Sequence, residues 1–239
     1  MLISACENSS SGNQASKIDY SKSYPPSNGG TMISAMTGEP SSLIYMVAGE
    51  SASAAIASNI FNSLLKYNQN LDLTGELAES WQVSDDQKSI TFKLKPNLKW
   101  ADGKPLTSAD VLFTWLLVTD EKTHSPYASD YQLVKQAQAP DPLTFKVTYE
   151  QAYAPALDSW SGLQILPKHL LEGQDVHTTP FARKPIGSSY YQLDSWTHGE
   201  NIKLSRNSSS VLGEANIEKL VTRIIPDNSA QFLELMADN

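Results

Sequence analysis

The sequence predicts an α+β (mixed α/β) fold, in which helices and strands are mixed along one chain of 239 residues. Residues 89–95 and 143–149 alternate apolar and polar side chains, the pattern of half-buried strands. Residues 53–65 and 107–117 instead repeat apolar side chains at helical spacing. These segments do not follow a strict strand–helix–strand order, and this favours the mixed class.

The first regular element is expected after a linker. Residues 7–30 are rich in Ser, Asn, Gly and Pro and show no hydrophobic periodicity. Residues 31–36 then predict a short strand. The helix predicted at residues 53–65 has its apolar face formed by Ile56, Ile60, Phe61, Leu64 and Leu65, with Ser51 or Ser53 as its N-cap.

The middle of the chain predicts a strand, a turn and a helix. The strand at residues 89–95 leads to a turn at residues 101–104, where Asp-Gly tolerates a positive φ. Thr107 and Asp110 have the spacing of a capping box at the start of the next helix. The apolar stripe of this helix is expected to consist of Val111, Leu112, Trp115 and Leu116.

The remaining elements are short. After the strand at residues 143–149, helices are expected at residues 153–160 and 167–171, the second ending at Gly173. Three strands and a final helix follow at residues 190–193, 202–204, 220–225 and 228–236.

The single cysteine, Cys6, follows Ile3-Ser4-Ala5, which resembles the cleavage site of a bacterial lipoprotein. This pattern predicts lipidation of Cys6 and an extracytoplasmic location. Only five residues precede Cys6, so the basic and apolar parts of a signal peptide are not in this sequence. The alternative is an incidental cysteine in a polar tail.

The composition argues against nucleic acid as a partner and against a membrane-spanning helix. The formal net charge is −8 and no Lys/Arg cluster occurs, so nucleic acid is not an expected partner. No apolar run approaches the roughly 20 residues of a membrane-spanning helix. We therefore expect membrane attachment only through a lipid on Cys6.

The sequence offers little catalytic or metal-binding chemistry. The four histidines, His124, His169, His177 and His198, have no metal-clamp spacing, and no cofactor motif occurs. Carboxylates stand in pairs at Asp85/Asp86 and Glu76/Glu79, which we interpret as solvated surface groups. We expect no enzyme, no metal and no cofactor. Five Trp and ten Tyr leave aromatic ligand contacts open.

Residues 73–115 resemble the signature region of the family 5 extracellular solute-binding proteins, the oligopeptide-, dipeptide- and nickel-binding components of ABC importers. The resemblance is carried by Leu-Ala-Glu-Ser-Trp at residues 77–81, by Lys-Trp-Ala-Asp-Gly-Lys-Pro-Leu-Thr at residues 99–107, and by Asp-Val at residues 110–111. Weaker likenesses extend it over residues 29–236.

The resemblance implies a lobe of the type II periplasmic-binding-protein kind with an inserted subdomain. Residues 1–29 would be the lipobox-like start and linker, residues 30–50 plus 166–239 the first lobe, and residues 51–165 the subdomain. Family members are about twice as long, so the chain matches the N-terminal portion and the second lobe is missing. A half-cleft alone is expected to bind peptide poorly, and the lobe's sheet is expected to expose an edge.

By analogy with the family, Gly49, Glu50, Ser51 and Tyr127 are the candidate ligand-binding residues. For Glu50 and Ser51 the alternative is helix capping. For Tyr127 the alternative is packing of the loop that contains Pro126.

Two departures from the family pattern bear on this site. Ile44-Tyr45 replace the usual Asp-Pro, which is expected to shift the loop or add an apolar surface. Ser189 replaces a glycine and is expected to resist a positive φ.

The resemblance implies a receptor that captures oligopeptides outside the cytoplasmic membrane, delivers them to the ABC permease and acts as a monomer. Three alternatives stay open. A receptor of the same family would take nickel, haem or oligosaccharide. A degenerate lobe would be only an interaction module. An extracytoplasmic hydrolase would use Asp85, Asp86 or Glu79.

Overall fold

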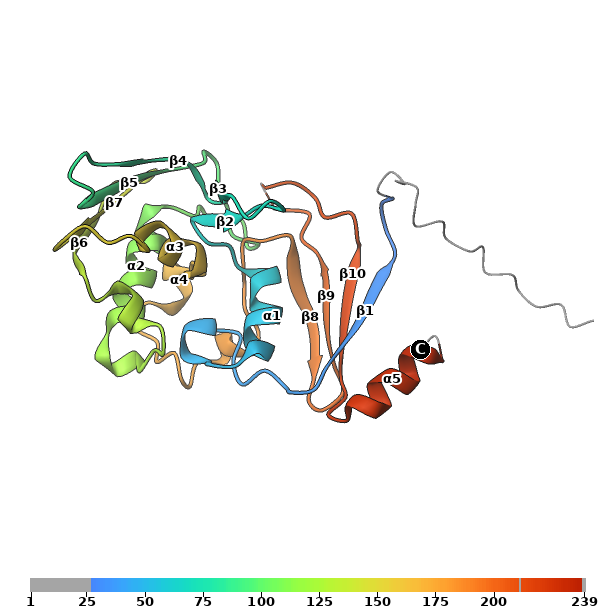
Figure 1. Cartoon of the computed structure of the whole chain (residues 1–239). Coiled ribbons are helices and arrows are strands. Elements are labelled where there is room, and N and C mark those ends of the chain that lie inside the picture. The colour runs from blue at the N-terminus through green and yellow to red at the C-terminus, as the bar shows by residue number, and fades with distance from the viewer. Residues whose placement is uncertain (1–26, 211, 238–239) are drawn as a thin grey trace, which may run out of the picture.

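The structure is a computed structural model that describes residues 27–210 and 212–237, apart from the side chain of Leu235. Within these residues the strands form two four-stranded sheets and one two-stranded sheet. The two larger sheets lie at opposite ends of the molecule, and helix α1 (Ser51–Ile60) stands between them (Figure 1). The α+β prediction is confirmed. Cys6 lies outside the described residues.

The first large sheet has the strand order β1-β10-β9-β8. β1 pairs in parallel with β10, with Met36 opposite Ile224, and the other neighbours pair antiparallel. β1 is an edge strand on which all residues but Met36 are exposed. Helix α5 (Asn228–Met236) follows β10. The strands are β1 (Thr31–Met36), β8 (Tyr191–Thr197), β9 (Asn201–Arg206) and β10 (Lys219–Ile224).

The second large sheet is an antiparallel sheet with the order β4-β5-β7-β6. Its inner face carries Phe92 and Phe145, whose ring centroids lie 6.2 Å apart. This face packs against Trp160, whose ring centroid lies 5.0 Å from that of Phe145. Helices α2, α3 and α4 lie beside it (Figure 1). These elements are β4 (Ala78–Val83), β5 (Ser89–Leu94), β6 (Val134–Asp141), β7 (Thr144–Tyr149), α2 (Ser108–Thr119), α3 (Ala156–Gly162) and α4 (Lys168–Leu171).

Short elements connect these layers. The two-stranded sheet pairs β2 (Leu65–Tyr67) with β3 (Leu73–Gly75). Four 3-10 turns are η1 (Tyr45–Val47), η2 (Glu121–Thr123), η3 (Ala128–Tyr131) and η4 (Pro180–Ala182). None of the helices in the described part of the chain has the length and apolar character needed to cross a membrane.

Helix α1 is shorter than the sequence predicted. It ends at Ile60 because Phe61 takes extended backbone angles, φ −114° and ψ 154°. Leu64 and Leu65 are fully buried beyond that end, so their burial prolonged the apolar pattern past the helix. The N-cap prediction was wrong as well, because Glu50 occupies that position without a side-chain capping bond.

Helix α2 confirms its predicted start but corrects its predicted stripe. Thr107 and Asp110 form the capping box. Leu116, however, is 52% exposed, whereas Thr114 and Val118 are fully buried. Thr114 fits the interior because its hydroxyl donates to the Asp110 carbonyl at 2.7 Å and accepts from the Leu166 amide at 2.9 Å.

The structure bears differently on the departures at Ile44 and Ser189. Ile44 is fully buried in the core rather than forming an apolar surface. Ser189 is not among the residues with positive φ, so no strain arises there. Its hydroxyl instead accepts from the amide of Asn62 at 3.1 Å, inside a buried polar cluster that includes Glu76.

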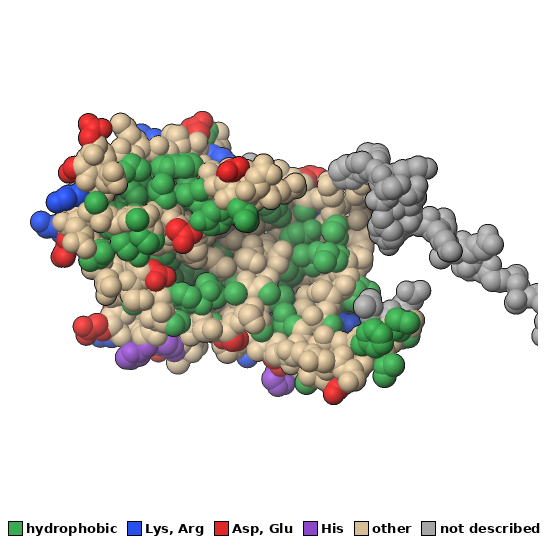
Figure 2. Space-filling view, viewed as in Figure 1, with side chains coloured by type: hydrophobic (Ala, Val, Ile, Leu, Met, Phe, Trp, Pro, Cys, Tyr) green, Lys and Arg blue, Asp and Glu red, His purple; other side chains and the backbone are tan. Residues whose placement is uncertain are grey.

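Hydrophobic side chains are visible on the surface across both halves of the molecule (Figure 2). On the part that contains α3, isolated acidic side chains stand among them, and the Lys and Arg side chains lie toward the outer edge in this view.

Candidate functional site

The loop at residues 45–51 is held against the loop at residues 125–127. The Ser125 hydroxyl donates to the Met46 carbonyl at 2.6 Å, and the Tyr127 hydroxyl donates to the Ala48 carbonyl at 3.5 Å. The rings of Tyr45 and Tyr127 pack with their centroids 4.6 Å apart. The fold thus brings together two segments that are distant in sequence, and both contain predicted site residues.

The carboxylate of Glu50 accepts hydrogen bonds from neighbouring parts of the fold. It accepts from the Ser41 amide at 2.8 Å, from the Ser41 hydroxyl at 3.0 Å and from the Ser53 hydroxyl. Partial burial opposes ionisation, yet these hydrogen bonds outweigh it and hold the pKa of Glu50 below its usual value. Glu50 therefore ties the loop that follows β1 to the start of α1.

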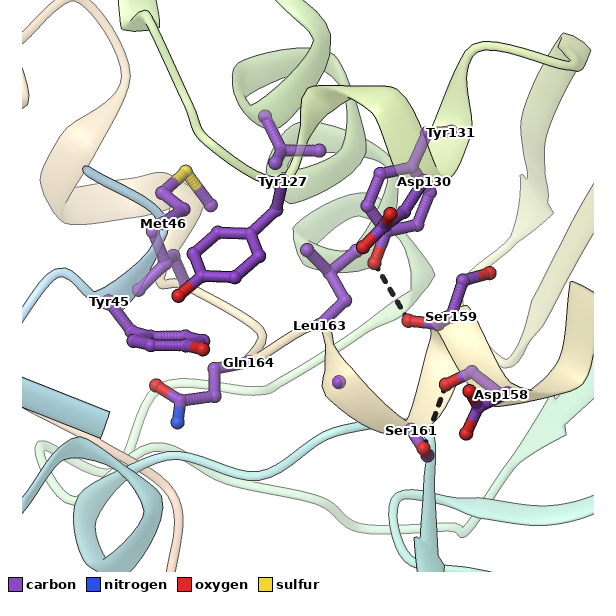
Figure 3. A pocket seen from close by; sticks show the side chains of 13 residues that line it. Tyr45, Met46, Tyr127, Asp130, Tyr131, Asp158, Ser159, Ser161, Leu163 and Gln164 are labelled. Atoms are coloured by element: carbon purple, nitrogen blue, oxygen red, sulfur yellow. Dashed lines mark hydrogen bonds between the residues drawn. The ribbon is translucent and has the colours of Figure 1, made fainter. Parts of the chain in front are cut away.

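Tyr127 lines a cavity of about 270 Å³ between η1, η3 and α3. Tyr45 packs against Tyr127, while Asp130 and Asp158 lie on the other side from Tyr45 in the view of Figure 3. Burial, with the neighbouring Tyr45 adding to it, raises the pKa of Tyr127 above its ordinary value, so its hydroxyl stays protonated. Gly49, Glu50 and Ser51 do not line this cavity.

A second hollow of about 510 Å³ adjoins the cavity beside α1 and β2. It adds Lys66 and Glu76 as charged lining residues. Burial raises the pKa of Glu76, although hydrogen bonds from Ser63 and Asn62 act in the opposite direction. The two hollows share the residues Tyr45, Ser161, Gly162 and Gln164.

Gln164 has unused hydrogen-bonding capacity at this junction. Its Oε1 is buried and accepts no hydrogen bond from the described residues. No backbone hydrogen bond between described residues involves Gln164 either. Leu163 before it is extended, with φ −81° and ψ 101°. The junction therefore offers free main-chain and side-chain groups to a ligand.

Sequence reasoning found only part of this site. Of the four candidates, Tyr127 lines the cavity. Gly49 and Glu50 belong to the loop that contacts Tyr127, and Ser51 is the first residue of α1. Tyr45, Asp130, Asp158 and Gln164 were missed as site residues. Tyr45 carried one signal, because it stood where the family pattern has another residue.

The carboxylate pairs form no common site, and of the histidines His124 and His177 lie near each other, with their ring centroids 6.4 Å apart. Glu79, Asp85 and Asp86 are exposed, whereas Glu76 is partly buried and hydrogen-bonded, which corrects its interpretation as a solvated group. His169 pairs with Asp102 at 2.7 Å, and His198 pairs with Glu39 at 2.7 Å. Residues 27–210 and 212–237 contain no group of three or more side chains suited to hold a metal.

Comparison with known proteins bears on the family. The model of the bacterial extracellular solute-binding proteins, family 5 (Middle), matches residues 72–239. The oligopeptide-binding protein AppA of Bacillus subtilis is 31% identical, over 99% of this chain and 44% of that protein. The chain thus spans less than half the length of this relative.

Solved structures with a similar fold also match most of this chain over less than half of their own length. AppA of Bacillus subtilis, in complex with a nonapeptide, superposes with a TM-score of 0.84 at 26% identity, over 90% of this chain and 44% of that one. The ABC transporter substrate-binding protein CtaP of Listeria monocytogenes gives 0.81 at 29%, over 88% and 43%. NikZ of Campylobacter jejuni, in complex with Ni(L-His), gives 0.81 at 27%, over 87% and 42%.

The family model covers more than half of the chain, and the neighbours share its fold over less than half of their own length. The predicted family and the predicted type II periplasmic-binding-protein lobe are therefore confirmed, and this chain belongs to the bacterial extracellular solute-binding proteins of family 5.

Proposed function

We propose that this chain is the peptide-binding part of an ABC importer's receptor and that it holds an extended peptide along the two joined hollows. The observation that carries the proposal is the continuity of these hollows at Tyr45 and Gln164. Successive side chains of an extended peptide point to opposite sides, so pockets in series suit alternate residues.

The chemistry at the junction supports a peptide rather than a compact solute. Main-chain recognition needs free backbone donors and acceptors, and Gln164 provides them in an extended segment. The aromatic rings of Tyr45 and Tyr127 supply apolar contact area without losing much conformational freedom. A bound peptide would also supply the donor that Gln164 Oε1 lacks.

The proposal includes a role for each predicted site residue. Tyr127 contacts the ligand directly. The loop that carries Tyr45 also contains Gly49, Glu50 and Ser51. Glu50 keeps that loop in place through hydrogen bonds from Ser41 and Ser53. Sites on such braced loops lose less entropy on binding.

The division of the chain is likewise proposed. Residues 51–165 would be an inserted subdomain, and β4 to β7 all fall inside this range. Residues 30–50 plus 166–239 would form the lobe, with β1 and β8 to β10 inside it. The site then lies where the two meet, since η1 belongs to one part and Tyr127 to the other.

The cellular setting follows from the same proposal. The receptor would act outside the cytoplasmic membrane, anchored by a lipid on Cys6, as a monomer that delivers its ligand to the permease. It would act by binding and release, without catalysis. The alternative ligand, a nickel complex, is suggested by the nickel complex bound to NikZ.

The test is native mass spectrometry of the chain mixed with a pool of short peptides, followed by titration of the retained peptides. Because a half-cleft is expected to bind peptide poorly, we expect retained peptide masses only at up to millimolar peptide, and Tyr127→Ala is expected to weaken binding about tenfold, the scale of a lost aromatic contact. Nickel with histidine is the competing probe.

The matched control is Tyr153→Ala, because Tyr153 is a half-buried tyrosine outside both hollows. It should leave peptide affinity within about twofold. The proposal is contradicted if no peptide is retained at millimolar concentration, or if the nickel–histidine complex binds while peptides do not.

A further inference from the structure

The cavity beside Tyr127 is unusual in the direction of its hydrogen bonds. Five hydroxyl groups line it, and three of them donate their one hydrogen to a backbone carbonyl of the protein at ordinary distances. Tyr131 donates to Ser159, Ser159 to Ala156, and Ser161 to Asp158, at 2.7, 2.9 and 2.8 Å. The contact from the Tyr127 hydroxyl to the Ala48 carbonyl is longer, at 3.5 Å, and the fifth hydroxyl is that of Tyr45. The hydroxyls of Tyr131, Ser159 and Ser161 can therefore only accept a hydrogen bond from a ligand.

The charged groups of the cavity add to this excess of acceptors. Among the described residues, Asp130 and Asp158 are the only carboxylates that line it, and this lining contains no Lys, Arg or His. Within the described residues neither aspartate takes part in a salt bridge, and the one bond to a side-chain donor is from the Tyr67 hydroxyl to Asp158, at 2.7 Å. Two exposed carboxylates thus line a partly apolar cavity without a salt-bridge partner among the described residues.

Other groups respond to this negative field. Burial is the main cause that raises the pKa of Tyr131, and the charges of Asp130 and Asp158 act in the same direction. Gln164, on the same cavity wall, contributes a buried Oε1 that accepts no hydrogen bond within the described residues. A ligand group that brings several N–H donors and a positive charge would complement this wall.

The size of the cavity limits what that group is. Sites that enclose a whole small ligand have volumes of roughly 300–1,000 Å³. This cavity, at about 270 Å³, suits one long side chain. The rings of Tyr45 and Tyr127 pack together on one side of the cavity and offer apolar surface to an aliphatic stem (Figure 3).

We propose that this cavity is the subsite for the basic side chain of a lysine or arginine residue in the bound peptide. The inference rests on the proposed peptide-binding function and adds a specificity to it. The ammonium or guanidinium group binds between Asp130 and Asp158, and the stem packs on Tyr127. The neighbouring hollow, which carries both Lys66 and Glu76, has no such preference.

The test compares three N-acetylated, C-amidated tetrapeptides that differ at one internal position, which holds lysine, arginine or norleucine. Acetylation removes the terminal ammonium as a competing cation. Binding to the full chain is measured by NMR titration at low and physiological salt. We expect lysine and arginine peptides to bind about tenfold tighter than the norleucine peptide, since charge-assisted bonds are the stronger ones.

The double variant Asp130→Asn plus Asp158→Asn should bring the three affinities within about twofold of each other. Both positions are exposed, and the amide oxygen introduced by Asp158→Asn would still accept from the Tyr67 hydroxyl, so folding should be kept. Asp85→Asn is the matched control, an exposed aspartate that lines neither hollow, and it should preserve the tenfold preference.

The outcomes separate the two proposals. If all three peptides bind equally well to the unmodified chain, the basic subsite is wrong and the peptide-binding function stands. If the preference persists in the double variant, or is lost equally in Asp85→Asn, it comes from the overall charge of −8 and the subsite is wrong. If no peptide binds, the proposed function itself fails.

Discussion

The two four-stranded sheets of this chain differ in how deeply their apolar side chains are buried. The sheet formed by β4 to β7 covers an aromatic core in which Phe92, Phe145 and Trp160 are fully buried. The sheet formed by β1 and β8 to β10 has β1 at its edge, where Met32 is 51% and Ile33 55% exposed. We therefore expect stability to be concentrated in the first sheet, around its buried strands β5 and β7.

The candidate site adjoins the more enclosed region. Tyr127 and Tyr131 reach the cavity from η3 and the residue before it, and Asp158 reaches it from α3, whose Trp160 packs into the aromatic core. A site carried by rigid, well-packed elements holds its groups in fixed positions. The comparison thus predicts that damage to the aromatic core affects both stability and ligand binding, whereas changes on β1 affect neither.

The largest effect is expected for Phe145→Ala. Phe145 is fully buried against Phe92 and Trp160, so its truncation leaves a cavity. The free energy of unfolding should fall by about 4 kcal/mol. Urea denaturation followed by circular dichroism measures it. A loss below about 1 kcal/mol would mean that the enclosed sheet is not the stable region.

The next largest effect is expected for Gly187→Ala, where the segment leading to β8 meets the end of α1. A Cβ at Gly187 would lie 1.9 Å from the Ile60 carbonyl oxygen, so the backbone must move. Destabilisation of about 3 kcal/mol is expected. The matched control is Gly162→Ala, which has open space and should change stability by less than about 1 kcal/mol. Equal melting shifts for the two variants would refute the close approach.

A smaller, pH-dependent effect is expected at Glu39, beside the more open sheet. Partial burial opposes its ionisation, but hydrogen bonds from Trp196, His198 and Gly199 hold the pKa of Glu39 below its usual 4.5. A lowered folded-state pKa means that the carboxylate stabilises the fold above about pH 4.5, and that this stabilisation disappears as the pH falls through the folded-state value.

Glu39→Ala should therefore cost about 1 kcal/mol at about pH 7, the scale of a charge-assisted hydrogen bond. The cost should shrink once the pH falls below the lowered pKa of Glu39. Urea midpoints of both proteins between about pH 3 and pH 7 measure this difference. A cost that grows on acidification has the opposite sign and would contradict the assignment.

The smallest effect is expected for Ile33→Thr. Ile33 lies on the exposed edge strand, so the change removes little buried area and keeps a β-branched side chain. Unfolding free energy should change by no more than about 0.5 kcal/mol. A loss above about 2 kcal/mol would show that β1 is as enclosed as β7 and would remove the contrast between the sheets.

Sequence patterns predicted the elements whose burial alternates in a regular way. β5 and β7 were predicted nearly residue by residue, because Ile90, Phe92 and Leu94 on β5 are buried and the residues between them are not. β4 and β6 were missed. Only Ala78 of β4 is buried, and β6 carries Pro140 and no buried residue, so neither shows a strand pattern.

The site was less predictable for a geometric reason. Tyr45, Asp130, Asp158 and Gln164 come from four separate segments, and no spacing in the sequence relates them. Tyr127 was identified only through the family resemblance. The direction in which the cavity hydroxyls donate is set by backbone carbonyls at Ala48 and Ser159, and sequence patterns carry no record of such contacts.

The most direct test of the account is a residue-resolved NMR titration of the full chain with an N-acetylated, lysine-containing tetrapeptide. The account predicts that backbone shifts concentrate at residues 45–51, 127–131 and 158–164, and that Asp130→Asn plus Asp158→Asn reduces them. Shifts confined to β1 and α5, or no shifts at millimolar peptide, would contradict a peptide site at the joined hollows.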